Sequence, residues 1–339
     1  MSKIISTCGF MCSGSSAVTD LLAEYEGVSA VDSFEYIFLY CPNGVFDLED
    51  KLLNNNNGLR SDEALHSFQT AMYELYVRRN WWCGNYKKRM GINFIKCVNQ
   101  YIDSLVDAEV SGHWYYTEKP SKWEDILRYV KKIIYRISLK NIIIPDKIMY
   151  GNKMLFAYPT QNEFRQKSKD FISELLKTES EYEVYDQLML PHNLHRIDDY
   201  FENLKAIVVK RDPRDVFIEN KYYWGKQPNM AVPYSMDVEQ FCLQYKRSHE
   251  LCMYEDNRNI KTIYFEDLCY KYEITKQNIE NFLGLCEEQH IKPKSRFIPE
   301  KSIKNTRQYL KLEYDNEKIR KEVQYIEVQL SEYLYEKEK

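Results

Sequence analysis

The segment that most constrains this fold is rich in Gly and Ser and begins at Cys8, where the chain reads Cys-Gly-Phe-Met-Cys-Ser-Gly-Ser-Ser. It follows a start that contains two β-branched apolar residues, Ile4 and Ile5. Apolar residues then recur at helical spacing over residues 17–22. The pattern predicts a strand, a tight loop and a helix in direct succession.

Such a loop has the chemistry of an anion cradle. Gly9 and Gly14 permit backbone conformations that a Cβ atom disfavours. Amides in the first turn of the helix point toward a bound anion. Hydroxyl groups come from Ser13, Ser15 and Ser16. We therefore expect these residues, with Cys12, to bind a phosphate-like group, and an ordinary polar turn is the alternative.

The spacing of Gly9 and Gly14 matches the nucleoside triphosphate loop, but one position differs. That motif continues Gly-Lys-Ser/Thr, and here Ser15 stands where the lysine reaches the β- and γ-phosphates. The difference disfavours ATP or GTP hydrolysis. A P-loop kinase stays open as an alternative function.

Composition excludes several classes of protein. A net charge of -4, from 47 basic and 51 acidic residues, provides no field that attracts nucleic acid or an anionic membrane. Nine cysteines, without paired metal-ligand spacing, are typical of reduced thiols, so we expect no structural metal. We expect neither a signal peptide nor a membrane anchor, since the chain starts in a strand and lacks an apolar run of about 20 residues. The expected location is cytoplasmic.

The order of predicted elements indicates an α/β fold. A second short strand at 27–31 completes a βαβ opening, which is typical of a mostly parallel sheet flanked by helices. Glu35 follows this strand and is a site candidate, or else an ordinary capping or solvated carboxylate. A polar break lies at 54–58. We expect one domain over 1–339, with a large helical insertion at 61–180 on the acceptor side of the site.

A second motif follows a buried strand at 204–210. The chain there reads Arg-Asp-Pro-Arg-Asp from Arg211, and Pro213 suits a helix start. Such an arrangement delivers Arg211 to the carboxyl end of a central strand, where a guanidinium binds phosphate through two parallel hydrogen bonds. A structural ion pair is the alternative.

The two motifs together resemble the sulfotransferase superfamily, in particular its bacterial carbohydrate-type members. The resemblance implies a P-loop-type fold and the donor PAPS (3′-phosphoadenosine 5′-phosphosulfate), with PAP as product and no metal. It implies that Arg211 holds the donor's 3′-phosphate. Tyr-Phe-Glu-Asp-Leu at 264–268 and the tail at 297–305 resemble later segments of the same family. Further donor contacts are implied for Asn220, Ser302 and Asn305.

Two positions depart from the family pattern. Cys12 stands where most members carry Lys or Arg before the Ser-Gly of the loop. Glu219 stands eight residues after Arg211, where many members carry a serine that binds the 3′-phosphate. Both changes bear on turnover, and a PAPS- or nucleotide-binding regulatory protein with this fold and without turnover is therefore the main alternative function.

The resemblance implies sulfuryl transfer to a hydroxyl of a carbohydrate or another small acceptor. Family members take their catalytic base from the strand before the arginine motif, and Asp186 occupies that strand end, unless it is a capping or solvated aspartate. His192 and Glu35 are the reserve candidates. For the cation that stabilises the leaving phosphate, Lys304 is the first candidate and Lys119 the second.

Overall fold

A computed structural model describes residues 3–78, 83–111, 122–138, 153–176, 180–227, 233–254, 257–313 and 316–335. The chain divides into two compact units. The first unit comprises Met1–Ile37, Trp81–Cys83 and Lys177–Lys339, and the second comprises Phe38–Asn80 and Gly84–Leu176. Within the described residues, no helix is both long and apolar enough to cross a bilayer.

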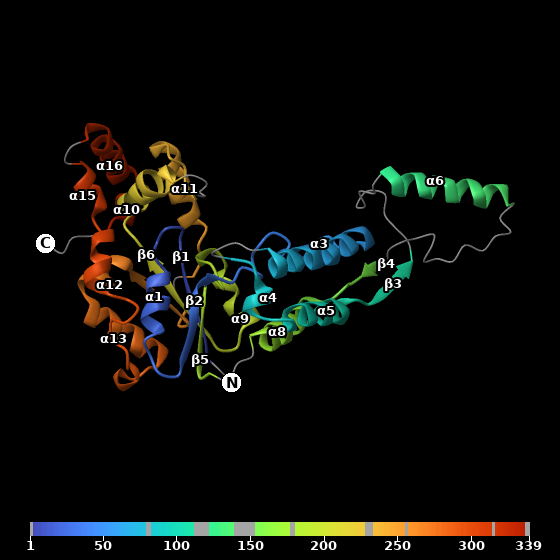
Figure 1. Cartoon of the computed structure of the whole chain (residues 1–339), viewed down its shortest axis with the longest axis horizontal. Helices are drawn as coiled ribbons and strands as arrows, with labels where there is room; N and C mark the ends of the chain where they lie inside the picture. Colours follow the sequence, from blue (N-terminus) through green and yellow to red (C-terminus); the bar gives the residue numbers. More distant parts are fainter. Residues whose placement is uncertain are drawn as a thin grey trace. The chain divides into compact units, whose positions relative to one another are not determined.

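The first unit is built on a parallel five-stranded sheet, in agreement with the predicted α/β fold (Figure 1). The strands are β1 (Lys3–Gly9), β2 (Val28–Glu35), β5 (Tyr182–Asp186), β6 (Leu204–Lys210) and β7 (Ile260–Tyr264), in the order β2-β5-β1-β6-β7. Strand β1 is central and pairs in parallel with both β5 and β6. Because all the strands run in the same direction, their carboxyl ends meet at one edge of the sheet, which is where α/β folds bind ligands.

The helices of this unit follow the strands. They are α1 (Ser16–Leu22), α9 (Ile197–Tyr200), α10 (Pro213–Ile218), α11 (Val238–Glu250), α12 (Phe265–Tyr270), α13 (Tyr272–Leu283), α14 (Pro299–Ser302), α15 (Gln308–Glu313) and α16 (Glu317–Gln329). Side-chain caps begin three of them: Asp212 accepts from the amide of Arg214 at α10, Asp237 from that of Gln240 at α11, and Asn316 from those of Lys318 and Ile319 at α16.

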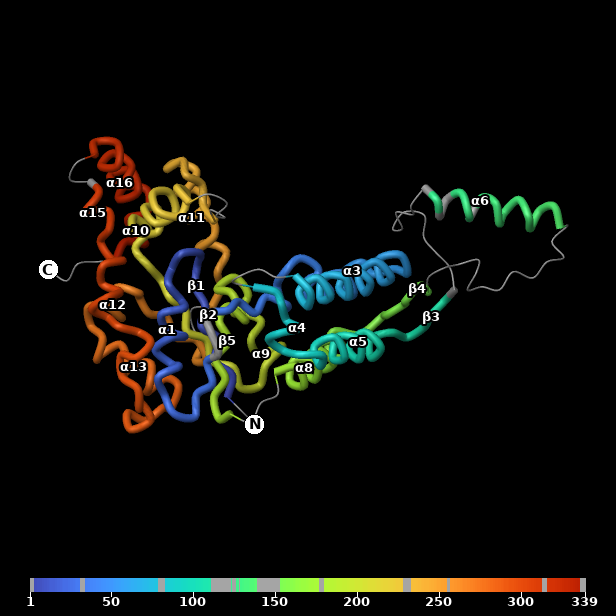
Figure 2. The backbone as a smooth tube through the Cα atoms, viewed as in Figure 1, coloured from blue at the N-terminus to red at the C-terminus, as the bar shows by residue number. Residues whose placement is uncertain are grey.

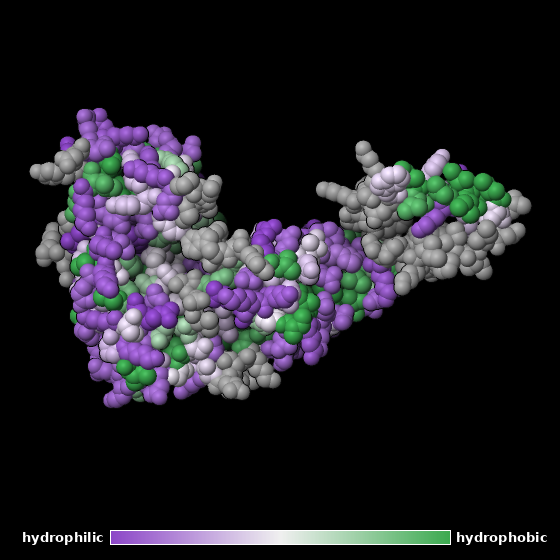
Figure 3. Space-filling model, viewed as in Figure 1, coloured by the Kyte–Doolittle hydropathy of each residue, from purple (hydrophilic) through white to green (hydrophobic). Residues whose placement is uncertain are grey.

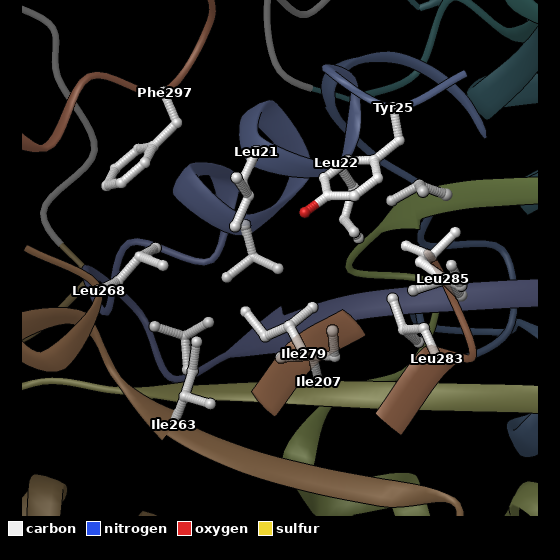
Figure 4. Packing of buried hydrophobic residues seen from close by; sticks show 14 of the residues in the cluster. Leu21, Leu22, Tyr25, Ile207, Ile263, Leu268, Ile279, Leu283, Leu285 and Phe297 are labelled. Carbon is white, nitrogen blue, oxygen red and sulfur yellow. The ribbon is translucent and has the colours of Figure 1, made fainter. Parts of the chain in front are cut away.

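Helices α1, α12 and α13 cover one face of the sheet (Figure 2). Figure 4 shows Leu21 and Leu22 of α1 together with Ile207 and Ile263 of the strands in one apolar cluster. On β6, Ala206 and Val208 alternate with Ile207 and Val209, and all four are fully buried. Since successive strand side chains point to opposite faces, β6 is covered on both sides, and its near-continuous apolar sequence reflects this.

The second unit is mainly helical. Its elements are α2 (Val45–Leu53), α3 (Gly58–Val77), α4 (Tyr86–Arg89), α5 (Asn93–Leu105), α6 (Lys122–Ile137), α8 (Gln161–Leu175) and an antiparallel pair, β3 (Ala108–Ser111) and β4 (Lys153–Phe156). The polar break predicted at 54–58 lies inside this unit, where the Asn57 side chain caps α3. Thr160 and Glu163 form a capping box at α8. The acceptor-side role expected for 61–180 stays a prediction.

Helix α6 exposes apolar residues at helical spacing, and Figure 3 shows hydrophobic side chains gathered along it. Trp123 and Ile137 are both 75% exposed. Residues Ile126, Leu127, Val130, Ile133 and Ile134 are exposed on the same helix. The three-and-four spacing places these side chains on one face.

Candidate active site

The loop between β1 and α1 lies at the carboxyl edge of the sheet, and of its two glycines Gly14 has a left-handed φ and Gly9 does not. Cys12 and Gly14 both have left-handed backbone angles, with φ of 62° and 84°. The Ser13 amide donates to the Phe10 carbonyl oxygen at 3.0 Å, which closes the turn. Among the described residues, no carbonyl or side-chain oxygen accepts from the amides of Gly14, Ser15 and Ser16, so these amides remain for an anion.

A serine hydroxyl inside the loop also lacks a partner. Ser13 is 3% exposed, and its Oγ has no hydrogen-bond partner within the described structure. A Cβ atom at Gly9 would lie 2.0 Å from this Oγ and 2.7 Å from the Val209 carbonyl oxygen, so only glycine leaves room for the hydroxyl. A buried hydroxyl without a hydrogen-bond partner costs stability, and a ligand oxygen that accepts its hydrogen bond would remove that cost.

Asp186 is joined to the loop by a hydrogen bond. Its Oδ1 accepts from the Ser15 hydroxyl at 3.2 Å and from the Thr7 hydroxyl at 3.2 Å. Gln187, with a left-handed φ of 55°, donates from Nε2 to the Ser15 oxygen at 3.1 Å. The proposed base and a loop hydroxyl therefore belong to one network.

A second carboxylate stands beside Asp186. Strands β2 and β5 are paired so that Glu35 and Asp186 are register partners. Burial and then the charge of Glu35 raise the pKa of Asp186 to about 7, although the Thr7 and Ser15 hydrogen bonds lower it. Burial also raises the pKa of Glu35. A carboxyl group with a pKa near neutrality has a strength suited to general base catalysis.

His192 belongs to an aromatic group at the start of the loop. The Phe10 ring contacts His192 edge-on, with centroids 5.7 Å apart, and stacks on His249 at 3.5 Å. Burial lowers the pKa of both histidines, that of His249 to about 4. His192 therefore lies beside Phe10 at the start of the loop.

Arg211 lies at the end of β6 and is 4% exposed. Its Nη1 donates to the Cys12 carbonyl oxygen at 2.9 Å and to the Glu219 carboxylate, and its Nη2 donates to the Asn305 carbonyl oxygen at 2.6 Å. Its Nε is buried without a partner among the described residues. The guanidinium also lies over the Phe265 ring, 5.2 Å from the centroid. Arg211 thus joins the loop to the tail.

Asp215 holds the residues directly after this tail, 307–309, by main-chain hydrogen bonds. The carboxylate is fully buried and accepts from the amides of Arg307 and Gln308, both at 2.6 Å, and of Tyr309 at 3.4 Å. Burial raises the pKa of Asp215 to about 6, although the charge of Arg211 and two of these amides lower it. This aspartate fastens residues 307–309 to the start of α10.

The remaining candidates occupy different environments. Asn220 is fully buried. Its Nδ2 donates to the Tyr234 carbonyl oxygen at 2.9 Å, and its Oδ1 accepts from the Tyr234 amide at 3.1 Å, so both ends of its side-chain amide are bonded to the main chain. Lys304 and Asn305 are exposed, Ser302 is half-buried, and Asn305 meets Arg211 through its carbonyl oxygen. Lys119 lies outside the described residues.

Sequence reasoning missed three contributors to this site. Thr7 donates a hydrogen bond to Asp186. A polar residue within a strand predicted to be buried was the sequence signal that could have identified it. Asp215 has only the local signal of an acidic residue in the first turn of a helix. Phe265 packs on Gly14, where a Cβ atom would lie 2.9 Å from a ring carbon, and no local pattern indicates that contact.

The family model described as "Sulfotransferase family" matches residues 5–289 of the chain. A solved structure titled "Sulfotransferase Domain from the Curacin Biosynthetic Pathway" is similar, with a TM-score of 0.40 and 12% sequence identity over 97% of this chain and 97% of that chain. No curated protein matches the sequence.

Proposed function

Since this chain belongs to the sulfotransferase family of enzymes, we propose that it moves a sulfuryl group from a nucleotide phosphosulfate donor to a hydroxyl group. PAPS is the donor that the family implies. The acceptor is a carbohydrate or another small hydroxyl compound. The proposal is supported most by the hydrogen bond between the Ser15 hydroxyl and Asp186, because it puts a carboxyl group with a pKa of about 7 in contact with the anion loop.

The loop fits the phosphosulfate arm of the donor. The free amides of Gly14, Ser15 and Ser16 and the unpartnered Ser13 hydroxyl are neutral donors for its oxygens. Gly9 and Gly14 keep the cradle open, since a Cβ atom at either position meets a neighbour at 2.9 Å or less. When bound, the donor supplies a sulfur atom that is attacked in line, while the bridging bond to its phosphate breaks.

On the acceptor side, Asp186 is the general base. Both of its described hydrogen bonds use Oδ1, which leaves Oδ2 to take the proton from the acceptor hydroxyl as the new oxygen–sulfur bond forms. Gln187 orients the same network through Ser15. The electron pair of the broken bond goes to the leaving phosphate, where the loop amides and a tail cation, Lys304 in our proposal, meet the charge.

The proposal is tested by sulfate content in the producing cell. Mass spectrometry of glycans and small metabolites compares cells that carry the wild-type gene, a deletion, Asp186→Asn, or the exposed control Asp103→Asn. We expect a sulfated product with the wild type and the control only. Equal sulfation in all four strains, with no sulfuryl transfer by the purified protein across a hydroxyl acceptor panel, would contradict the proposal.

A further inference from the structure

The guanidinium of Arg211 is already bonded by the protein itself. Both terminal nitrogens donate to groups of this chain: to the Cys12 carbonyl oxygen and the Glu219 carboxylate from Nη1, and to the Asn305 carbonyl oxygen from Nη2. Only Nε lacks a partner among the described residues. An anion that approaches Arg211 therefore meets an ion pair rather than a free cation.

Glu219 lies close to the anion loop. The same Nη1 atom contacts Glu219 and the carbonyl oxygen of Cys12, two residues before Gly14, so one guanidinium separates this carboxylate from the loop backbone. Glu219 begins the π-helical turn Glu219–Tyr223, which continues α10. Its side chain is 23% exposed, so the carboxylate remains accessible to a ligand while it pairs with Arg211.

The surroundings of this pair are rich in carboxylates. Burial would lower the pKa of Arg211, but Glu219, Asp215 and Glu266 raise it, so the guanidinium stays charged beside several acids. Asp212 carries its own partner, Arg214, at 2.6 Å. A dianion added here faces more negative charge than Arg211 balances.

Resting on the proposed function, we propose that Glu219 is a donor-specificity residue that favours a free ribose 3′-hydroxyl over a 3′-phosphate. The donor is then adenosine 5′-phosphosulfate at least as readily as PAPS. A ribose hydroxyl donates a hydrogen bond to a carboxylate, as in many dinucleotide sites, and this leaves the Arg211–Glu219 pair intact.

A 3′-phosphate meets two obstacles at the same position. It must either lie beside the Glu219 carboxylate, where like charges repel, or displace it from Arg211. Displacement leaves a partly buried carboxylate without its partner, which weakens binding. Specificity of this kind arises as much from repulsion of the wrong ligand as from attraction of the right one.

Calorimetry with the two donor products tests the proposal. AMP and PAP differ only in the 3′-phosphate, and each is titrated into the wild type, Glu219→Ser, Glu219→Gln and the control Glu327→Gln. The control removes the charge of another Arg-bound glutamate, since Glu327 pairs with Arg214 at 2.6 Å. A thermal melt confirms that each variant is folded.

We expect the wild type to bind AMP at least as tightly as PAP. Glu219→Ser should then tighten PAP relative to AMP by about tenfold or more, Glu219→Gln by less, and Glu327→Gln not at all. If the wild type binds PAP at least tenfold more tightly than AMP, the specificity proposal is wrong and the proposed function stands. If the wild type binds neither nucleotide, both are overturned.

Discussion

The Ser15 hydroxyl donates a hydrogen bond to Oδ1 of Asp186 at 3.2 Å, and the two residues are 171 positions apart in the chain. The bond connects the anion loop after β1 to the end of the neighbouring strand β5. One serine side chain thereby joins the proposed base to the proposed anion loop.

Asp186→Asn should lower kcat by about 100-fold or more, because it removes a general base while keeping the side-chain shape. In the wild type, kcat should rise with pH and level off above about 7, since a base acts only when deprotonated and the pKa of Asp186 is raised to about 7. Initial rates across pH measure both effects. A wild-type profile that is flat between about pH 5 and 8 would exclude Asp186 as the base.

The raised pKa of Asp186 also predicts a pH dependence of stability. An unfolded aspartate ionises near a pKa of about 3.9, so the wild type should lose free energy of unfolding as pH rises from about 4 to about 7. Asp186→Asn should reduce this loss. Part of it should remain, because burial also raises the pKa of Asp215 to about 6 and of Glu266 to about 7. Urea unfolding at several pH values provides the test, and an unchanged slope in the variant would count against it.

Gly14→Ala should abolish nucleotide binding while the unit stays folded. The residue has a φ of 84°, and the added Cβ would lie 2.9 Å from the Phe265 ring. Gly284→Ala is the matched control, since its φ is 78° and nothing lies within 4 Å of the new Cβ. It should cost stability of about 1 kcal/mol through backbone strain and leave binding unchanged. Normal AMP and PAP titrations for Gly14→Ala would show that the loop is only a turn.

Lys304→Ala should lower kcat about tenfold or more with little change in nucleotide affinity, because a cation at the leaving group acts mainly as charge develops. The neighbouring exposed Lys301→Ala is the control. Burial raises the pKa of the Cys12 thiol to about 12, so the loop itself carries no charge at that position. Cys12→Lys should therefore recover part of the rate of Lys304→Ala. Normal turnover of Lys304→Ala, with no gain from Cys12→Lys, would remove Lys304 from the mechanism.

Asp215→Asn should loosen residues 307–309. In the wild type each carboxylate oxygen accepts a hydrogen bond from a main-chain amide, Oδ2 from Arg307 and Oδ1 from Gln308. The asparagine side chain keeps only one oxygen, and its NH₂ group would face the other main-chain N–H, so one buried hydrogen bond is lost. Hydrogen exchange should accelerate at Arg307 and Gln308 and stay slow in the central strand β1. Glu300→Gln, which removes an exposed ion pair with Lys294, is the control and should leave these amides protected. Unchanged exchange in Asp215→Asn would show that other contacts hold these residues.

The sequence by itself determined the elements and their order. Ile4 and Ile5 before a Gly- and Ser-rich turn predicted β1, the loop and α1, and the apolar run at 204–210 predicted β6. These signals are local, since periodicity and the conformational freedom of glycine act within a few residues. Because strand ends are also marked by local signals, the sequence was enough to predict that Asp186 and Arg211 lie at the ends of strands.

Only the tertiary structure decided what surrounds those residues. Arg211 meets the carbonyl oxygen of Asn305, 94 positions away, and the Phe265 ring packs on Gly14. The pairing of Arg211 with Glu219 and the raised pKa of Asp186 both depend on burial and on charges from other segments. The spacing of residues in the sequence cannot predict this ion pair or this pKa shift. Electrostatic energy depends on distance and solvent exposure in three dimensions rather than on position in the chain.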